Sequence, residues 1–194
     1  MASTADIQQL RQETGAGIMD VKQALDEAGN DIEKARDVLR KKGAALAAKK
    51  GERETGEGAV FSYIHPGARV GVMLKLFCET DFVARTEDFQ HLGQDIALHI
   101  AAMGPQYIAR DEVPADILER EKEVYAAQVA QSGKSEDVVS KIIEGKLEKF
   151  YGESVLLDQS FVKSADITVQ QRIEETVTKV GENIRVGSFV RFEL

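Results

Sequence analysis

The sequence predicts an α+β fold, in which an N-terminal bundle of three helices precedes a small antiparallel sheet packed with helices. Three observations lead to this prediction. Apolar residues recur at helical spacing in residues 1 to 54, they alternate every second residue in later segments, and helical spacing returns between those segments. Such a grouping of strands and helices is typical of α+β proteins, and we expect two domains, residues 1–54 and 55–194.

The first domain divides into helices at residues that favour helix ends. Gly15 and Gly29 are placed to end the first and second helices, because glycine readily takes the left-handed conformation that follows a last turn. Asn30 and Glu33 have the spacing of a capping box, so the third helix is predicted to begin at Asn30. Gly43 is expected to end it. The following stretch, "AALAAKKGERETGEG", predicts a tether that is helical in part.

The second domain is expected to hold a three-stranded antiparallel sheet. The segments "GAVFSYI" and "RVGVMLKLFC" flank "HPGA", where Pro66 and Gly67 suit the two central positions of a type II turn. The C-terminal segment alternates as a strand does and is expected to return to this hairpin. Its alternating apolar residues are Ile184, Val186, Val190 and Phe192.

Four helices are predicted between these strands and are expected to wrap the sheet. They begin near Arg85, near Pro114, at Ser135 and at Thr168, and the last has a capping-box partner in Gln171. Two of them have a clear apolar face at helical spacing. These faces consist of Phe89, Leu92, Ile96 and Ile100 in the first helix, and of Val138, Val139, Ile142 and Ile143 in the third.

Charge and composition narrow the classes of function. The formal net charge of −8 argues against direct binding to nucleic acid or to an anionic membrane, because phosphate groups require a positive surface. No stretch approaches the ~20 apolar residues that span a bilayer, and the N-terminus lacks the pattern of a signal peptide. Cys78 is the single cysteine, which excludes an intrachain disulfide and fits a reducing compartment. We expect a cytoplasmic protein.

The sequence contains no motif of an enzyme or of a cofactor site. A phosphate-binding loop, a dinucleotide fingerprint, a zinc-protease helix and a nucleophile elbow are all missing. His65, His91 and His99 lack metal-ligand spacing and are interpreted as surface or boundary residues. Cys78, at a strand end, is interpreted as a small buried hydrophobic residue. We therefore expect no enzymatic activity, no cofactor and no metal.

The segment "ETDFVA", residues 79–84, does not fit a purely structural interpretation. Phe82 stands directly after Asp81, at the point where the chain leaves its sheet. A core phenylalanine would be expected inside the strand, so Phe82 is a candidate for contact with a partner. In the alternative, Asp81 caps the helix that starts near Arg85, and Phe82 folds back on that helix as a hydrophobic staple.

Three segments carry a resemblance to a known family. They are "TGAGIMDVKQAL" (residues 14–25), "ETDFVA" and "EGKLEKFYGESVLLDQSFV" (residues 144–162). In this order they closely resemble bacterial elongation factor Ts, over essentially the whole chain. The resemblance implies a guanine-nucleotide exchange factor that binds elongation factor Tu, with GDP or without nucleotide. It would promote GDP release, so that GTP can bind during translation elongation.

The resemblance also implies two sets of contact residues. In the family, the segment "TDFV" displaces the magnesium ion of elongation factor Tu, and a UBA-like N-terminal module docks on the nucleotide-binding domain of that partner. For Met19 the alternative is a place in the core of the module. The candidate contacts are Thr80, Asp81, Phe82 and Val83 for magnesium dislocation, and Met19, Asp20 and Lys22 in the N-terminal domain.

The chain differs from the longer members of the family that it resembles. Those carry a duplicated core subdomain and a protruding helical hairpin, and this chain of 194 residues is expected to lack both. It resembles the short form, which works as a homodimer. Phe189, Val190 and Phe192 in the last strand support a homodimer, because sheet edges must be paired or covered. Shielding of that edge by the chain's own helices is the alternative.

Two further points remain open in the sequence. Phe77 stands where many family members have asparagine, which makes this strand end more apolar. The alternative function is that of a non-catalytic UBA-like adaptor, which would bind a helix or peptide and leave its partner's ligand unchanged.

Overall fold

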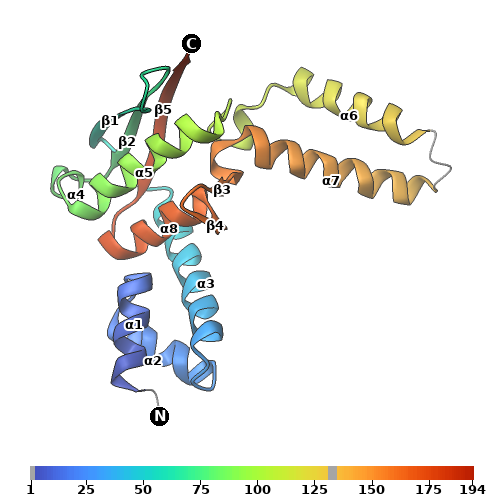
Figure 1. Cartoon of the computed structure of the whole chain (residues 1–194). Helices are drawn as coiled ribbons and strands as arrows, with labels where there is room; N and C mark the ends of the chain where they lie inside the picture. Colours follow the sequence, from blue (N-terminus) through green and yellow to red (C-terminus); the bar gives the residue numbers. More distant parts are fainter. Residues whose placement is uncertain (1–2, 131–134) are drawn as a thin grey trace.

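The computed structural model describes residues 3–130 and 135–194, and its α+β fold agrees with the prediction (Figure 1). Helices come first, and the sheet lies in the second part of the chain. The helices are α1 (Thr4–Thr14), α2 (Ile18–Glu27), α3 (Ile32–Lys50), α4 (Asp81–Ala84), α5 (Glu87–Met103), α6 (Ala115–Ala130), α7 (Glu136–Ser154) and α8 (Val169–Val180). The strands are β1 (Glu57–Ile64), β2 (Val70–Cys78), β3 (Ser160–Phe161), β4 (Ser164–Thr168) and β5 (Ile184–Glu193), and the short 3₁₀ helices are η1 (Arg110–Glu112) and η2 (Leu156–Asp158).

Helices α1, α2 and α3 form the predicted N-terminal bundle around a small core of their own. Gly15 follows α1 with a φ of 68°, and Gly29 follows α2 with a φ of 64°, so both predicted helix ends are confirmed. The buried residues of this bundle are Leu10, Ala16, Val21, Ala24, Leu25, Ala35 and Leu39.

The predicted start of α3 at Asn30 is wrong. Asp31 caps the helix instead, because its carboxylate accepts a hydrogen bond of 3.2 Å from the amide of Lys34. Asn30 has a φ of 65°, and its amide donates to the carbonyl oxygen of Leu25 at 2.8 Å. Asparagine is among the few residues other than glycine that tolerate the left-handed conformation, so here it closes α2 rather than opening α3.

The predicted end of α3 at Gly43 is also wrong. The helix runs through Gly43 to Lys50 and is 19 residues long. Gly43 lies where α3 approaches α8, since a Cβ at this residue would come within 3.0 Å of Thr178 Oγ1. This glycine therefore permits a close approach of two helices. The expected tether is reduced to residues 51–56, between α3 and β1.

The three-stranded antiparallel sheet has the order β1-β2-β5, so the C-terminal strand returns to the hairpin as predicted. At the hairpin turn the amide of Ala68 donates to the carbonyl oxygen of His65 at 2.9 Å, and Gly67 has a φ of 93°. These features agree with the predicted type II turn.

The main core lies between one face of this sheet and the helices α5 and α8 (Figure 1). The predicted apolar face of α5 is buried in full, and α5 begins at Glu87, two residues after Arg85, which is the C-cap of α4. The predicted capping box of Thr168 and Gln171 at the start of α8 is confirmed. Core residues include Phe61, Leu74, Leu76, Phe89, Leu92, Ile96, Ile100, Ile173 and Val177.

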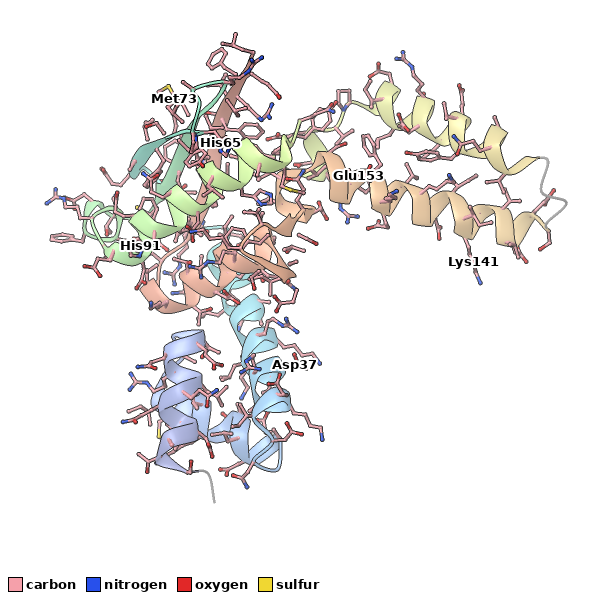
Figure 2. All side chains as sticks on the ribbon, viewed as in Figure 1. Asp37, His65, Met73, His91, Lys141 and Glu153 are labelled. Atoms are coloured by element: carbon pink, nitrogen blue, oxygen red, sulfur yellow. The ribbon has the colours of Figure 1, made fainter. Side chains whose placement is uncertain are left out.

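Two expectations about α6 and α7 are wrong. These helices do not wrap the sheet, because they form a helical hairpin that protrudes from the rest of the molecule (Figure 1). The same hairpin contradicts the expectation that a chain of this length has no room for one. Val139, Ile142 and Ile143 are only half-buried, since α7 packs mainly on α6, and Lys141 and Glu153 extend into solvent (Figure 2).

Strands β3 and β4 form a small second sheet that the sequence analysis does not predict. They have only two and five residues, which is too short for an alternating pattern to be recognised. Phe161 in β3 is buried in the main core, where its ring stacks on His99 at a centroid distance of 5.9 Å.

Most of the buried hydrophobic residues fall into two separate clusters, one in the bundle and one around the sheet. This separation supports the division into residues 1–54 and 55–194, which we keep as a proposal. Among the described residues, no helix is both long and apolar enough to cross a bilayer.

Candidate functional site

The segment that follows β2 forms a single helical turn, α4, with Thr80 as its N-cap. The Thr80 hydroxyl accepts a hydrogen bond of 3.4 Å from the amide of Val83. The side chain of Phe82 is 78% exposed, whereas Val83 is only 8% exposed and belongs to the main core. The turn thus points two neighbouring apolar side chains in opposite directions, one into the protein and one into solvent.

The alternative for this segment, in which Asp81 caps the next helix and Phe82 folds back on it as a hydrophobic staple, is wrong. Thr86 caps α5, since its hydroxyl accepts a hydrogen bond of 3.3 Å from the amide of Phe89. Asp81 instead forms an ion pair of 2.6 Å with Arg85, and both side chains are largely exposed. Phe82 does not fold back on α5, because its ring remains open to solvent.

Several hydrogen bonds hold α4 on the protein. The carboxylate of Glu182 accepts from the Thr80 amide at 3.0 Å and from the Thr80 hydroxyl at 2.8 Å. The thiol of Cys78 donates to the carbonyl oxygen of Thr80 at 3.1 Å, and the amide group of Gln90 donates to the carbonyl oxygen of Ala84 at 2.7 Å. The backbone under Phe82 is therefore fixed although its ring is not.

The second set of candidates lies on α2. Met19 is 74% exposed, so its alternative place in the bundle core is wrong. Asp20 and Lys22 are also exposed, while Val21, between them, is buried. The N-cap of α2 is Gly17, which makes no side-chain cap, and the carboxylate of Asp20 lies beside it, since a Cβ at Gly17 would come within 3.0 Å of Asp20 Oδ2. The start of α2 thus presents Met19, Asp20 and Lys22 to solvent, and Ile18 beside them is 47% exposed.

Cys78 and Phe77 both have structural surroundings. Cys78 is fully buried, and burial raises the pKa of its thiol to about 11, which confirms its interpretation as a small buried residue. The ring of Phe77 lies between Lys75 and Arg185, with charges 5.8 Å and 4.9 Å from the ring centroid. Gly187 leaves room for it, because a Cβ there would come within 2.3 Å of the ring.

The interpretation of the three histidines as surface or boundary residues holds for two of them. His65 and His91 are exposed, and His91 lies on the outer face of α5 (Figure 2). His99 is fully buried, so for this residue the interpretation is wrong. Within residues 3–130 and 135–194, no group of histidine, cysteine and carboxylate side chains has the geometry of a metal site.

The helices α4 and α2 therefore present exposed side chains to a partner, and in α4 the backbone that carries them is firmly held. Glu182 is the functional candidate that the sequence analysis misses. It lies 102 residues from Thr80 in the chain, and no local pattern connects the two. Its position directly after Gly181, which ends α8, predicts a turn and nothing more.

The comparisons with known proteins identify a family for this α+β chain. The sequence model of the family described as "Elongation factor TS" matches residues 4–194. A protein of Fervidobacterium nodosum named elongation factor Ts is 54% identical over 188 residues, which are 97% of this chain and 95% of that protein. The proteins of the same name from Thermosipho melanesiensis and Geobacter metallireducens are 53% and 54% identical over 192 residues, 99% of this chain, and 98% and 89% of their own lengths.

The chain therefore belongs to the elongation factor Ts family, and with it to the translation elongation factors. The close agreement in length with the first two of these relatives identifies it as a short form.

Proposed function

We propose that this protein is a guanine-nucleotide exchange factor that binds elongation factor Tu in the cytoplasm and promotes GDP release during translation elongation. The observation that carries the proposal is the exposed ring of Phe82 on the anchored turn α4. Family membership supports the choice of partner. The protein acts without a cofactor or metal of its own and without direct contact to nucleic acid or membrane.

Phe82 supplies free energy for deforming the nucleotide site. Burial of its ring in an apolar pocket of the partner contributes roughly 1.5–3 kcal/mol, which is available to move the segments that position magnesium. By thermodynamic linkage, if this protein weakens GDP binding, GDP weakens the binding of this protein by the same factor. An exchange factor therefore needs a binding surface and no catalytic side chain.

Asp81 adds charge to the same contact. Its ion pair with Arg85 is an exposed pair within one helical turn, and such pairs contribute only about 0.3–0.5 kcal/mol. The carboxylate can therefore exchange Arg85 for polar groups near the partner's metal at little cost. Thr80 and Val83 contribute indirectly, by holding α4 in place. Thr80 is hydrogen-bonded to Glu182, and Val83 is buried in the core.

The exposed side chains on α2 contribute recognition. Met19, Asp20 and Lys22 lie on the bundle, far along the chain from α4. They belong to a domain with its own core, so their contacts act mainly by holding the second domain on the partner.

A homodimer completes the proposal. The sheet face turned away from α5 carries exposed apolar side chains from all three strands, among them Met73 (Figure 2), and we call it the outer sheet face. Ile64 and Phe192 flank Gly71 in one row, and Met73 and Val190 are paired in the next. A large apolar patch of this kind is typical of a protein interface. The outer sheet face consists of Val60, Ile64, Met73, Val190 and Phe192.

The experiment is release of labelled GDP from purified elongation factor Tu. Phe82→Ala is expected to keep the melting temperature and to bind nucleotide-free elongation factor Tu. It should slow GDP release about tenfold or more, because a loss of 1.4 kcal/mol is a factor of ten. A well-folded Phe82→Ala protein with undiminished exchange would contradict this role.

Ile100→Val is the control. It removes one methyl group from the core on α5, which destabilises the fold by about 1 kcal/mol, and it should reduce GDP release only in proportion to the folded fraction. If the unaltered protein binds elongation factor Tu without accelerating GDP release, the adaptor alternative is correct instead.

A further inference from the structure

The turn that connects α8 to β5 is joined to α4 by a reciprocal set of hydrogen bonds. Glu182 accepts from both the amide and the hydroxyl of Thr80. In the opposite direction, the carboxylate of Glu79 accepts a hydrogen bond of 2.6 Å from the amide of Asn183. Two consecutive residues of one segment thus bind two consecutive residues of the other.

The turn is itself fixed from the N-terminal side. Asn183 is 7% exposed, and its side-chain amide donates to the carbonyl oxygens of Gly51 at 3.3 Å and of Arg53 at 3.0 Å. The ammonium group of Lys50, the last residue of α3, donates to the carbonyl oxygen of Gly181. Residues 181–183 therefore lie between the end of α3 and the start of α4 and bind both.

We propose that Glu182 is a positioning residue for nucleotide exchange, which holds Thr80 and through it sets the direction of Phe82. This inference rests on the proposed function. Glu182 does not need to touch elongation factor Tu, because its effect passes through the backbone of α4.

The geometry of Thr80 shows why a carboxylate is needed. Its hydroxyl donates its single hydrogen to Glu182, which leaves a lone pair directed at the amide of Val83 as the N-cap of α4. Without Glu182 the hydroxyl is free to rotate, and the backbone amide of Thr80 loses its partner as well. One side chain therefore controls both the cap and the residue that carries it.

The small size of α4 makes the support necessary. A helix of four residues has no stability in isolation, because the first turn fixes several residues for very few hydrogen bonds. Val83 and Ala84 are buried and hold the inner side of the turn. Phe82 contributes little, since its ring is in solvent. Glu182, together with the thiol of Cys78, fixes the N-terminal end, where the exposed residues begin.

The test is a double-mutant cycle on GDP release from elongation factor Tu. Glu182→Ala is expected to slow release about tenfold at saturating concentration. In a Phe82→Ala background the same substitution should add less than about twofold, because the residue through which it acts is already gone. If Glu182→Ala slows release by the same factor in both backgrounds, the proposal is overturned.

Two further variants separate positioning from folding. Glu182→Gln keeps the size and one acceptor oxygen and should restore part of the lost exchange, with a melting temperature close to that of the unaltered protein. Glu174→Ala, on α8, where the side chain accepts a hydrogen bond from Gln170, should leave release unchanged. If the unaltered protein accelerates release and both Glu182 variants match it, this inference fails while the proposed function stands. If the unaltered protein does not accelerate release, the proposed function itself fails.

Discussion

In the protein interior, His99 donates a hydrogen bond from its Nε2 to Gln159 Oε1 at 2.9 Å. The direction follows from the other ring nitrogen, because Nδ1 accepts from the amide of Val162 at 3.1 Å and so carries no proton. The amide group of Gln159 is fixed in turn, since it donates to the carbonyl oxygen of Glu153 at 2.7 Å. Both nitrogens of a neutral imidazole are therefore satisfied, and burial lowers the pKa of His99 below its usual 6.5.

We predict that the free energy of unfolding decreases as the pH falls below about 6.5. In that range the unfolded chain protonates His99 and the folded protein does not, so the unfolded state binds more protons. The contribution of this residue is fully present above pH 6.5 and falls by up to about 1.4 kcal/mol per pH unit between the unfolded and the lowered folded pKa. Urea titrations between pH 5 and 7.5 would measure it.

His91→Gln is the control for this prediction, because His91 is exposed on the same helix. It should keep the pH dependence, whereas His99→Gln should remove it at some loss of stability. An unchanged slope in His99→Gln would show that other groups cause the effect.

Met19→Ala should weaken binding to elongation factor Tu about tenfold without changing the melting temperature, because the side chain is exposed on α2. Substitution is a sharper test than removal of residues 1–54, since α3 packs on α8 and its loss would open the core. Titration calorimetry would give the affinity. Leu10→Ala, in the bundle core, should instead lower the melting temperature, and a Met19→Ala protein with full affinity would exclude Met19 as a contact.

Phe192→Lys combined with Met73→Lys should convert a dimer into a monomer, because both changes place charge on the outer sheet face. Sedimentation at micromolar concentration would measure the change in mass. Val138→Lys on the hairpin is the matched control, as Val138 is also exposed but lies on α7. A monomer before any substitution would remove the homodimer from the proposal.

Gly93→Ala should destabilise the protein by about 1–3 kcal/mol through overpacking. A Cβ at this residue of α5 would come within 2.3 Å of the Phe61 ring, which is itself buried and packs on Phe89. Gly145→Ala in α7 meets no atom within 4 Å and should stabilise its helix by about 0.5–1 kcal/mol. Thermal unfolding of the two variants should therefore give shifts of opposite sign, and equal shifts would contradict the packing argument.

Features with a local cause could be predicted from the sequence. The capping box of Thr168 and Gln171 involves residues three apart, and the buried face of α5 follows from helical spacing alone. Asn30 and Gly43 were misassigned because their roles depend on what surrounds them. An asparagine that can open a helix can also close the one before it. A glycine that can end a helix can also admit a neighbouring helix.

The candidate site shows the same limit. The place of Phe82 after an acidic residue at a strand end marks it as a candidate contact, but the sequence does not say whether its ring is exposed in the free protein, and the structure shows that it is. The hydrogen bonds that support Phe82 could not be predicted from the sequence, because Glu182 reaches Thr80 only when β5 pairs with β2. The protruding hairpin was missed for a related reason. Spacing predicts that a helix has an apolar face, but it does not name the element that covers it.

The continuity of α3 also fixes an angular relationship. Leu39 belongs to the bundle core and Gly43 to the contact with α8, so a single rigid helix joins the two. One residue inserted between them would rotate the bundle by about 100° and advance it by about 1.5 Å, carrying Met19 to another side of the molecule. Seven inserted residues would return it to almost the same azimuth, about 10 Å further out. The number of residues between Leu39 and Gly43 therefore sets the rotation of the bundle about the α3 axis, whereas a flexible linker would leave that rotation free.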